Sequence, residues 1–342
     1  MAGSSKGAVL AAIVGNTALT AAKFGAFAIT GSGSMFSEAI HSLADTGNQA
    51  LLFFGIRQSE RPADHLFPYG YGGERFLYAL LSAIGIFVLG CGFTVYHGVH
   101  NLLDPPTLEF SWWSVGVLAV ALVVEGTVLS LAVRTIAAQK GERSLVEFVR
   151  TTNDPTIAAV LLEDSVACLG VLVAAAGMGL SLWTGNPVYD ALGAIAIGGM
   201  LGLVAVFLGM RNRTLLLGPT ADPADVEAIV RLVEAHPAVR RVRQVKSRLL
   251  GSHRFRVYVD VEYDGDELGR RAHAKMADDA WDCETDAGRR RLAETLGRYV
   301  CAEMAAVNDA LEADIRKRFP GLAALETEAD GSPPLEPAAT NG

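Results

Sequence analysis

The chain has 342 residues, of which 51% are hydrophobic and 19% are charged, and its formal net charge is −8. A mean hydropathy of +0.30 is too high for an average soluble domain, whereas the charge is too high for a protein lying wholly in a membrane, and this composition excludes a disordered or collagen-like chain. The excess of acidic residues gives no support for binding to nucleic acid.

The charged residues are distributed unequally along the chain. Residues 1–210 contain 23 of them, whereas the shorter segment 211–342 contains 43. This difference predicts a membrane half followed by a soluble half. The four cysteines form no CxxC pair, so the sequence predicts neither a disulfide framework nor a thiolate zinc site.

The first half contains six stretches long enough to span a membrane, because a transmembrane helix needs about 20 mostly apolar residues. These stretches are residues 7–30, 34–57, 75–100, 112–138, 156–183 and 187–210. Loops 31–34, 101–110 and 184–187, at one end of the spans, contain no Lys or Arg, and the basic residues gather at the other end. The positive-inside rule therefore places both termini and the soluble half in the cytoplasm.

In the second half, the spacing of apolar residues predicts a small domain that contains both helices and strands. Residues 221–235 predict a helix capped by Asp222, and residues 296–319 predict a long amphipathic helix. Strands are predicted over 239–250, 253–263 and 322–329, the first two forming a hairpin. The order helix-strand-strand-helix-strand is that of a small ferredoxin-like α+β sandwich.

The predicted fold class is therefore an α-helical polytopic membrane protein, with six transmembrane helices and a C-terminal cytoplasmic ferredoxin-like α+β domain. We expect the transmembrane domain to comprise residues 1–212 and the cytoplasmic domain residues 213–330. The polar segment 264–293 is an insertion in the second domain, and residues 331–342 form a disordered tail.

The HSLAD motif in the span 34–57 gives the first indication of chemistry. His41 and Asp45 are four residues apart, so both side chains project from one helical face and can bind a single cation. Asn48 lies three residues further along the same stripe. Imidazole nitrogen with carboxylate oxygen suits Zn²⁺ and also accepts Fe²⁺, Co²⁺ or Mn²⁺. A buried structural hydrogen bond is the alternative, and the spacing alone does not separate the two.

The span 156–183 contains two adjacent acids, Glu163 and Asp164. Two neighbouring carboxylates in hydrocarbon repel each other, so they need a cation or a shared proton. The alternative places one of them at the cytoplasmic mouth or in an ion pair with a basic residue. Adjacent helical residues point about 100° apart, so we expect the two acids to have different roles.

Four other polar residues interrupt the spans. Glu125 is interpreted as an interhelical hydrogen-bond partner in preference to a proton carrier, and Asn16 as a helix-packing residue. Lys23 is expected to extend its ammonium outward to the membrane surface. Asp190 is expected to lie near the outer surface, where a helix N-terminus favours an anion.

The chain resembles a known family. HSLAD, the loop FPYGYGGERF, the segment NDPTIAAVLLEDSVACLG and the ferredoxin-like tail are similar to the cation diffusion facilitator family of metal/proton antiporters, and more narrowly to its zinc transporter 9-like branch. The resemblance covers residues 7–329. It implies a homodimer in a lipid bilayer, namely the plasma (inner) membrane, or a mitochondrial membrane if the chain is eukaryotic.

The resemblance also implies a metal site. It places ligands at His41, Asp45 and Asp164. The position of the usual fourth ligand is occupied by Val160, so Glu163, a water molecule or Asn48 would complete the shell, and Asn16 and Glu125 are accessory candidates.

The loop before the third span departs from the family pattern. Many relatives have histidines there, at positions that are Phe67 and Tyr71 in this chain. The second metal site of that loop is therefore not expected, although Asp64 lies close by.

The predicted function is secondary transport. A divalent metal, Zn²⁺ first among the candidates, would leave the cytoplasm in exchange for protons, because metal and protons compete for neutral imidazole and ionised carboxylates. No GxxxxGK[ST] motif is present, so we expect no ATP-driven step, and we expect neither an enzyme nor a prosthetic group. Transport of Mn²⁺, Fe²⁺ or Co²⁺, a membrane metal sensor, and a membrane metallohydrolase without an HExxH motif remain the alternatives.

Overall fold

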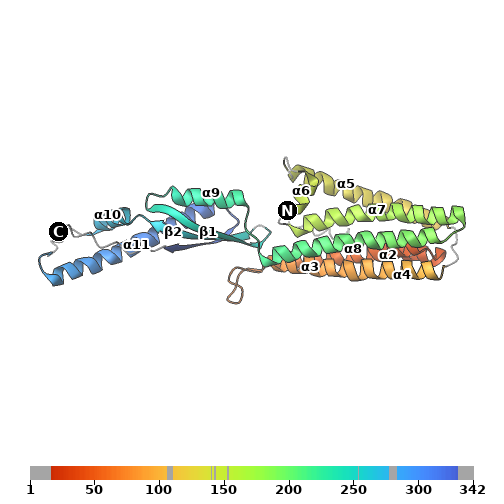
Figure 1. Cartoon of the computed structure of the whole chain (residues 1–342), viewed down its shortest axis with the longest axis horizontal. Coiled ribbons are helices and arrows are strands. Elements are labelled where there is room, and N and C mark those ends of the chain that lie inside the picture. Colours follow the sequence, from red (N-terminus) through yellow and green to blue (C-terminus); the bar gives the residue numbers. More distant parts are fainter. Residues whose placement is uncertain are drawn as a thin grey trace, which may run out of the picture. The chain divides into compact units, whose positions relative to one another are not determined.

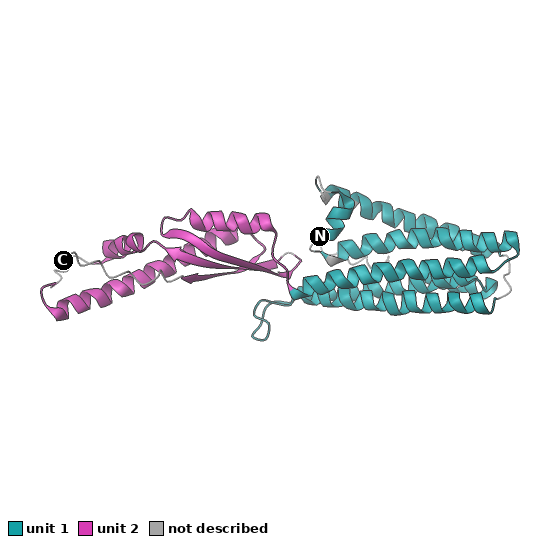
Figure 2. Cartoon of the chain, in the orientation of Figure 1, with its two compact units in different colours: residues 1–217 teal, residues 218–342 magenta. Residues whose placement is uncertain are grey.

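The structure of the protein is a computed structural model that describes residues 17–105, 111–139, 141, 144–151, 154–252, 254–276 and 283–329. The chain divides into two units, residues 1–217 and residues 218–342 (Figure 2).

The first unit is built from helices (Figure 1). Residues 17–30 are helical and are followed by α2 (Gly33–Ser59), α3 (Glu74–Gly85), α4 (Thr94–Leu103), α5 (Trp112–Gln139), α6 (Leu145–Thr151), α7 (Pro155–Thr184) and α8 (Val188–Leu217).

Four helical stretches in the described part of this unit are long and apolar enough to cross a membrane. They are Glu74–Leu103, Trp112–Ala138, Thr156–Thr184 and Val188–Leu217. The prediction of a helical multi-pass membrane unit is therefore confirmed. The count of six spans stays a prediction, because α2 carries many polar residues and the first predicted span begins outside the described residues.

Local sequence signals explain where two of these helices begin and end. The backbone at Gly31 has a φ of 67°, a conformation that glycine adopts without steric cost. The Ser32 hydroxyl then accepts a hydrogen bond from the Met35 amide at 3.1 Å and caps α2. Asp154 caps α7 in the same way through the Thr156 amide, and Gly185 in the left-handed conformation ends that helix.

The third predicted span is interrupted by an eight-residue π-helical segment, η1 (Ile86–Phe93), between α3 and α4. Hydropathy alone predicts a uniform helix here, because it reports which residues are apolar and not their hydrogen-bond register. Beyond η1, α4 lies against α8, where a Cβ on Gly198 would stand 2.7 Å from the Val95 side chain. The absence of a side chain at Gly198 thus permits the close approach that small residues provide between membrane helices.

Two hydrophobic clusters lie on either side of a polar layer in this unit. One cluster contains Met35 of α2 and Val166 of α7, and the other contains Leu52 of α2 and Leu161 of α7. The candidate site residues of both helices fall between these positions along the chain, and so does Glu125 of α5, between Ala121 and Ile136. The candidate site residues are therefore held between two apolar layers.

The second unit is a mixed α/β domain (Figure 1). Its elements are α9 (Pro223–Glu234), β1 (Val239–Gly251), β2 (Arg254–Tyr263), α10 (Gly265–Lys275), α11 (Asp286–Arg318) and β3 (Leu322–Ala329). The sheet has the order β1-β2-β3, with β1 antiparallel to β2 and β3 parallel to β2. The two predicted helices and three predicted strands occur in the predicted order, with one further helix, α10, between β2 and α11.

The segment predicted as a polar insertion, 264–293, is largely helical. It contains α10 and the first turns of α11, which starts at Asp286 and not at residue 296, with Thr285 as its N-cap. An ion pair between Lys275 of α10 and Glu303 of α11 joins the two helices. The tail predicted to be disordered, 331–342, lies outside the described residues, and so do residues 277–282.

Alternate residues of β2 form the core of the second unit. Val257, Val259 and Val261 are fully buried, and so are Ile229 of α9 and Ile315 of α11. The alternation is that of a sheet with one covered face.

Glu262 at the end of β2 is an exception, because it is a charged residue with only 5% of its surface exposed. Its carboxylate accepts hydrogen bonds from Nε of Arg241 and of Arg243, both at 2.8 Å. The hydrogen bond from Arg241 is the largest influence on the pKa of Glu262, and with that from Arg243 it holds this pKa below the ordinary value of 4.5.

We predict that Glu262→Gln loosens β1, because the neutral amide cannot hold both guanidinium groups. Because the pKa of Glu262 is lowered in the fold, its carboxylate stabilises the domain fully above pH 4.5, and this contribution is lost as the pH falls through the lowered pKa. Hydrogen exchange of the β1 amides in the full chain should be faster in the variant at pH 7, and the difference from wild type should shrink below pH 4.5.

Glu227→Gln is the matched control, because Glu227 and Arg231 form a largely exposed pair on α9 that contributes little. Equal exchange rates of β1 in wild type and Glu262→Gln at pH 7 would contradict the prediction.

Candidate functional site

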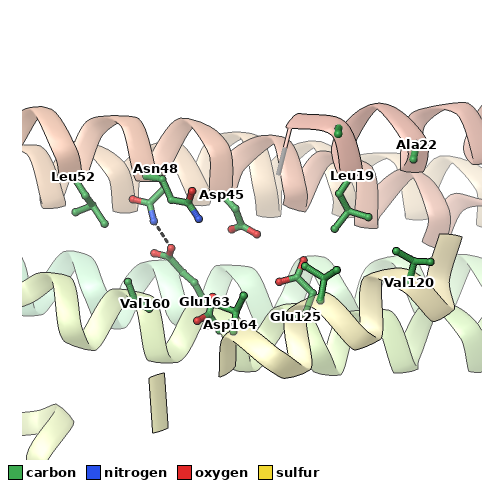
Figure 3. A pocket seen from close by; sticks show the side chains of 14 residues that line it. Leu19, Ala22, Asp45, Asn48, Leu52, Val120, Glu125, Val160, Glu163 and Asp164 are labelled. Carbon is green, nitrogen blue, oxygen red and sulfur yellow. Dashed lines mark hydrogen bonds between the residues drawn. The ribbon is translucent and has the colours of Figure 1, made fainter. Parts of the chain in front are cut away.

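A cavity of about 570 Å³ lies within the first unit. Side chains from the helix 17–30, α2, α5 and α7 line it (Figure 3). Its lining residues include five acidic or amide side chains singled out from the sequence, and these are Asp45, Asn48, Glu125, Glu163 and Asp164. The cavity therefore gathers polar residues from three helices, and those of α2 and α7 are more than 100 residues apart in the chain.

His41 and Asp45 form the α2 part of the site. Their side chains lie one helical turn apart, with 3.6 Å between His41 Nε2 and the Asp45 carboxylate. His41 is fully buried, and neither of its ring nitrogens has a hydrogen-bond partner among the described residues. Since buried polar atoms nearly always find a partner, an imidazole with free nitrogens beside a carboxylate fits a cation as the missing partner.

Glu163 and Asp164 form the α7 part of the site, and they have different neighbours. Glu163 accepts a hydrogen bond from the Asn48 amide (Figure 3). The Asn48 carbonyl oxygen accepts one from the Ser82 hydroxyl of α3. Three helices are thus joined by this relay. The other carboxylate oxygen of Glu163 and one oxygen of Asp164 are buried without a hydrogen-bond partner in the described part of the chain.

Asp45 and the two α7 acids face each other across the cavity without closing into one cluster, and His41 is not among the residues that line it. Among the described residues, no three His, Cys, Asp or Glu side chains are close enough to hold a metal ion together. Val160, at the position where the resemblance implies a fourth ligand, lines the same cavity and offers only methyl groups. Glu125 of α5 lines it as well (Figure 3). Asn16, an accessory candidate, lies outside the described residues.

The expected position of Lys23 is wrong. Its side chain does not extend to the membrane surface but is fully buried, with its ammonium 3.0 Å from Glu38 and 2.7 Å from the Ser42 hydroxyl. A carboxylate of Glu125 lies 3.9 Å away. The physical reason is that two acids inside the bundle need a counter-charge, and Lys23 satisfies this need at close range, whereas outward extension would leave both acids unpaired.

Asp190 lies in the first turn of α8, at a helix N-terminus as expected. Its carboxylate also contacts the N-terminus of a second helix, α2. Its carboxylate is 1% exposed and accepts hydrogen bonds from the Ser32 hydroxyl at 2.7 Å and the Gly33 amide at 2.5 Å. The Ser34 amide, at 3.3 Å, and the Ser34 hydroxyl complete the shell. The carboxylate thus neutralises the positive end of α2 and ties it to α8.

The loop between α2 and α3 uses its acid internally. Asp64 accepts hydrogen bonds from the amides of Leu66 and Phe67 and, at 2.7 Å, from the Tyr71 hydroxyl. The hydrogen bond from Tyr71 contributes most to lowering the pKa of Asp64. The Phe67 and Tyr71 rings stack with their centroids 4.5 Å apart. Asp64 is therefore engaged in holding the loop.

Sequence reasoning missed Glu38 and Ser42 as partners in a buried network. The signal was the helical spacing, since Glu38, His41, Ser42 and Asp45 recur at three- and four-residue intervals in α2 and hence share one side of the helix.

The chain is similar to several known proteins. Residues 9–217 match the family description "Cation efflux transmembrane domain". The mitochondrial proton-coupled zinc antiporter SLC30A9 of Mus musculus is 37% identical over 313 residues, which are 90% of this chain and 55% of that protein. This chain thus spans about half the length of that relative.

Two further relatives are more fully covered. Metal tolerance protein C4 of Arabidopsis thaliana is 34% identical over 347 residues, which are 97% of this chain and 75% of that protein. The cation-efflux pump FieF of Shewanella oneidensis is 28% identical over 261 residues, which are 75% of this chain and 82% of the pump.

We predict that Asp190→Ala destabilises the first unit by about 3 kcal/mol, because it leaves several buried donors at the start of α2 without an acceptor. Unfolding of the purified chain by titration with sodium dodecyl sulfate in mixed micelles measures this difference. Asp104→Ala, at the exposed end of α4, is the control and should change the free energy of unfolding little. A free energy for Asp190→Ala equal to that of the control would show that the contact is dispensable.

Proposed function

Because the chain belongs to the cation efflux family, we propose that it is a secondary transporter that moves a divalent metal ion, Zn²⁺ first among the candidates, across a membrane in exchange for protons. Support comes from the family match over residues 9–217 and from the names of relatives, which include a proton-coupled zinc antiporter. The observation that carries the proposal is the cavity between α2 and α7, which is lined by Asp45 and by two α7 acids, Glu163 and Asp164, each with a buried oxygen that has no hydrogen-bond partner among the described residues.

His41, Asp45 and Asp164 would bind the cargo, and Glu163 would contribute directly or by orienting Asn48. All four belong to the α2 and α7 parts of the site. Because the two parts are not closed around a common point, binding would draw α2 and α7 together. A cargo site that is completed only when the cargo arrives suits transport, since the ion must also leave.

Proton coupling would follow from the chemistry of these ligands. Metal binding requires a neutral imidazole and ionised carboxylates, so each proton bound at His41, Asp45 or Asp164 opposes the cargo. Protons that arrive from the acidic side would displace the ion, and their loss on the other side would prepare the site again. Asp45 and Asp164 line one cavity, and His41 lies beside it, 3.6 Å from the Asp45 carboxylate.

The position of the cavity supports entry of the cargo from the basic end of the bundle. Along α2 the lining runs from Asp45 to Leu52, toward Arg57 in the last turn. The opposite end of α2 is held against α8 by Asp190. In Figure 1, α5 also leans away from α7 toward the end where α6 follows. By the positive-inside rule the basic end faces the cytoplasm.

The membrane and the assembly are also part of the proposal. The zinc antiporter relatives carry the word mitochondrial in their names, which supports a mitochondrial membrane if the chain is eukaryotic, and the plasma (inner) membrane otherwise. Both termini lie on the cytoplasmic side in this proposal, or on the equivalent side of an organelle. A homodimer follows from the family resemblance.

The valine at position 160 favours a second set of transported ions, namely Mn²⁺, Fe²⁺ or Co²⁺. Val160 offers no ligand atom where the resemblance implies one, and the Asn48 amide, which lines the same cavity, is hydrogen-bonded to Glu163 and Ser82. A shell that water oxygens would then complete suits Mn²⁺ or Fe²⁺ better than a site of four tight protein ligands does. Export of Mn²⁺, Fe²⁺ or Co²⁺ by the same route is therefore the alternative.

We predict that Asp45→Ala lowers proton-driven zinc uptake at least tenfold, because it removes a ligand that also binds the exchanged proton. Purified protein in liposomes with an imposed pH gradient and an internal zinc-sensitive dye measures uptake. Asp104→Ala, at the exposed end of α4, is the control. Uptake by wild type that is independent of the gradient would contradict proton exchange, and zinc binding without uptake would favour a sensor.

We also predict that Val160→Asp shifts the preference toward zinc, because it adds a carboxylate one helical turn before Asp164. In the same liposomes, the apparent KM for Zn²⁺ should fall about tenfold relative to that for Mn²⁺, a change of about 1.4 kcal/mol. A competition series with Zn²⁺, Mn²⁺, Fe²⁺, Co²⁺ and Cd²⁺ gives the ranking. Val160→Ala controls for the change in size, and equal shifts for Zn²⁺ and Mn²⁺ would rule out a ligand role for position 160.

A further inference from the structure

Lys23 is the one lysine or arginine among the buried polar residues of the described chain. Its ammonium lies 3.0 Å from a carboxylate oxygen of Glu38 and 2.7 Å from the Ser42 hydroxyl, both in α2. It also lies 3.9 Å from a carboxylate oxygen of Glu125 in α5. A positive charge is thus shared between two acids on different helices.

This network adjoins the candidate site. Ser42 follows His41 directly in the chain. Glu125 contacts the ammonium on one side and lines the cavity together with Asp45 and Asp164 on the other (Figure 3). The ammonium is therefore separated from the cavity by a single carboxylate.

A fixed ammonium and a mobile metal ion compete for the same negative charge. In an interior from which water is excluded, charges a few ångströms apart interact far more strongly than they do in water. Lys23 can turn toward Glu38 or toward Glu125, because it has a flexible four-carbon stem. Each position leaves a different amount of negative charge facing the cavity.

We propose that Lys23 is a tethered competitor of the transported cation, which Glu38 holds to one side so that metal can bind. The strength of the pair between Lys23 and Glu38 then sets how tightly the cavity holds its cargo. The inference rests on the proposed function for the identity of the cargo, and it assigns to Lys23 a role in affinity and not in the ligand shell.

The position of Glu38 is itself determined by packing. Its second carboxylate oxygen is buried, without a hydrogen-bond partner in the described residues, and lies against Gly170 of α7. A side chain at position 170 would occupy the place of this oxygen. Gly170 therefore leaves the room in which Glu38 holds the ammonium.

A purely structural ion pair and a tethered competitor predict different results. If the pair only stabilises the helices, removing either partner harms the site, and both variants weaken metal binding. If Lys23 competes with the cargo, the two variants have opposite effects. Glu38→Gln releases the ammonium toward Glu125 and the cavity, whereas Lys23→Met removes the competitor.

The test measures binding of radioactive Zn²⁺ to the purified full chain in detergent at one fixed pH, by equilibrium dialysis. We expect the Kd to rise about tenfold in Glu38→Gln and to fall about tenfold in Lys23→Met. Lys23→Arg keeps the charge and should stay close to wild type. The double variant K23M/E38Q, which removes both charges of the Lys23–Glu38 pair, should bind more tightly than Glu38→Gln and serves as the test if Lys23→Met does not fold.

A second variant moves Glu38 without changing any charge. Gly170→Ala displaces the Glu38 carboxylate and should raise the Kd for Zn²⁺ in the same direction as Glu38→Gln. Gly179→Ala is the matched control, because it lies in the same helix and a Cβ there meets no other atom within 4 Å. Equal Kd values for the two glycine variants would contradict the proposal that the position of Glu38 against Gly170 sets the affinity for Zn²⁺.

The outcomes separate this inference from the proposed function. Shifts of the Kd in the same direction in Lys23→Met and Glu38→Gln, or in neither, overturn the competitor role even if wild type transports zinc in liposomes. Opposite shifts with a wild type that moves no metal under any pH gradient support the competitor role and remove the transport proposal. A wild type that binds no Zn²⁺ overturns both.

Discussion

The arrangement of the first unit depends on one constraint, namely that an ionised side chain inside an apolar bundle must find a counter-charge or a full set of hydrogen bonds. Two solutions are visible in full. Asp190 is surrounded by donors from the start of α2, and Glu38 is paired with Lys23. Each solution joins helices that are distant in the chain, so the same contacts that neutralise these acids also fix the packing of α2.

The α7 acids in the cavity have neither a counter-charge nor a full set of hydrogen bonds among the described residues. Glu163 has one oxygen bonded to Asn48 and a second that is buried without a hydrogen bond, and Asp164 also has such an oxygen. The apolar clusters on either side offer them no partner. Glu38 has a buried oxygen without a hydrogen bond as well, but Lys23 supplies its counter-charge. The presence of a counter-charge or of a full set of hydrogen bonds thus separates the acids that hold the bundle from those available to a cation.

How much the sequence predicted depends on how far apart along the chain the interacting residues lie. The pairing of His41 with Asp45 and the cap of α9 by Asp222 depend on residues within one helical turn, so spacing suffices for them. The partners of Lys23 and Asp190 lie 15 to 158 positions away in the chain, and no local pattern reveals them. For Lys23 the outward extension and the buried pair are both compatible with the sequence, and only the tertiary position of Glu38 decides between them.

The same reasoning explains why an incomplete site suits the proposed transport. Val160 gives the cavity one ligand fewer than a site with a carboxylate or imidazole at that position would have. The Lys23 ammonium beside Glu125 reduces the negative charge that the cavity presents to a cation. Tight binding favours a static metal site, whereas a carrier must release its ion within each cycle. The positive charge of Lys23 and the missing ligand at position 160 both lower the affinity for the bound ion. Protons that bind to the remaining ligands can then displace the ion, which is the release step of the cycle.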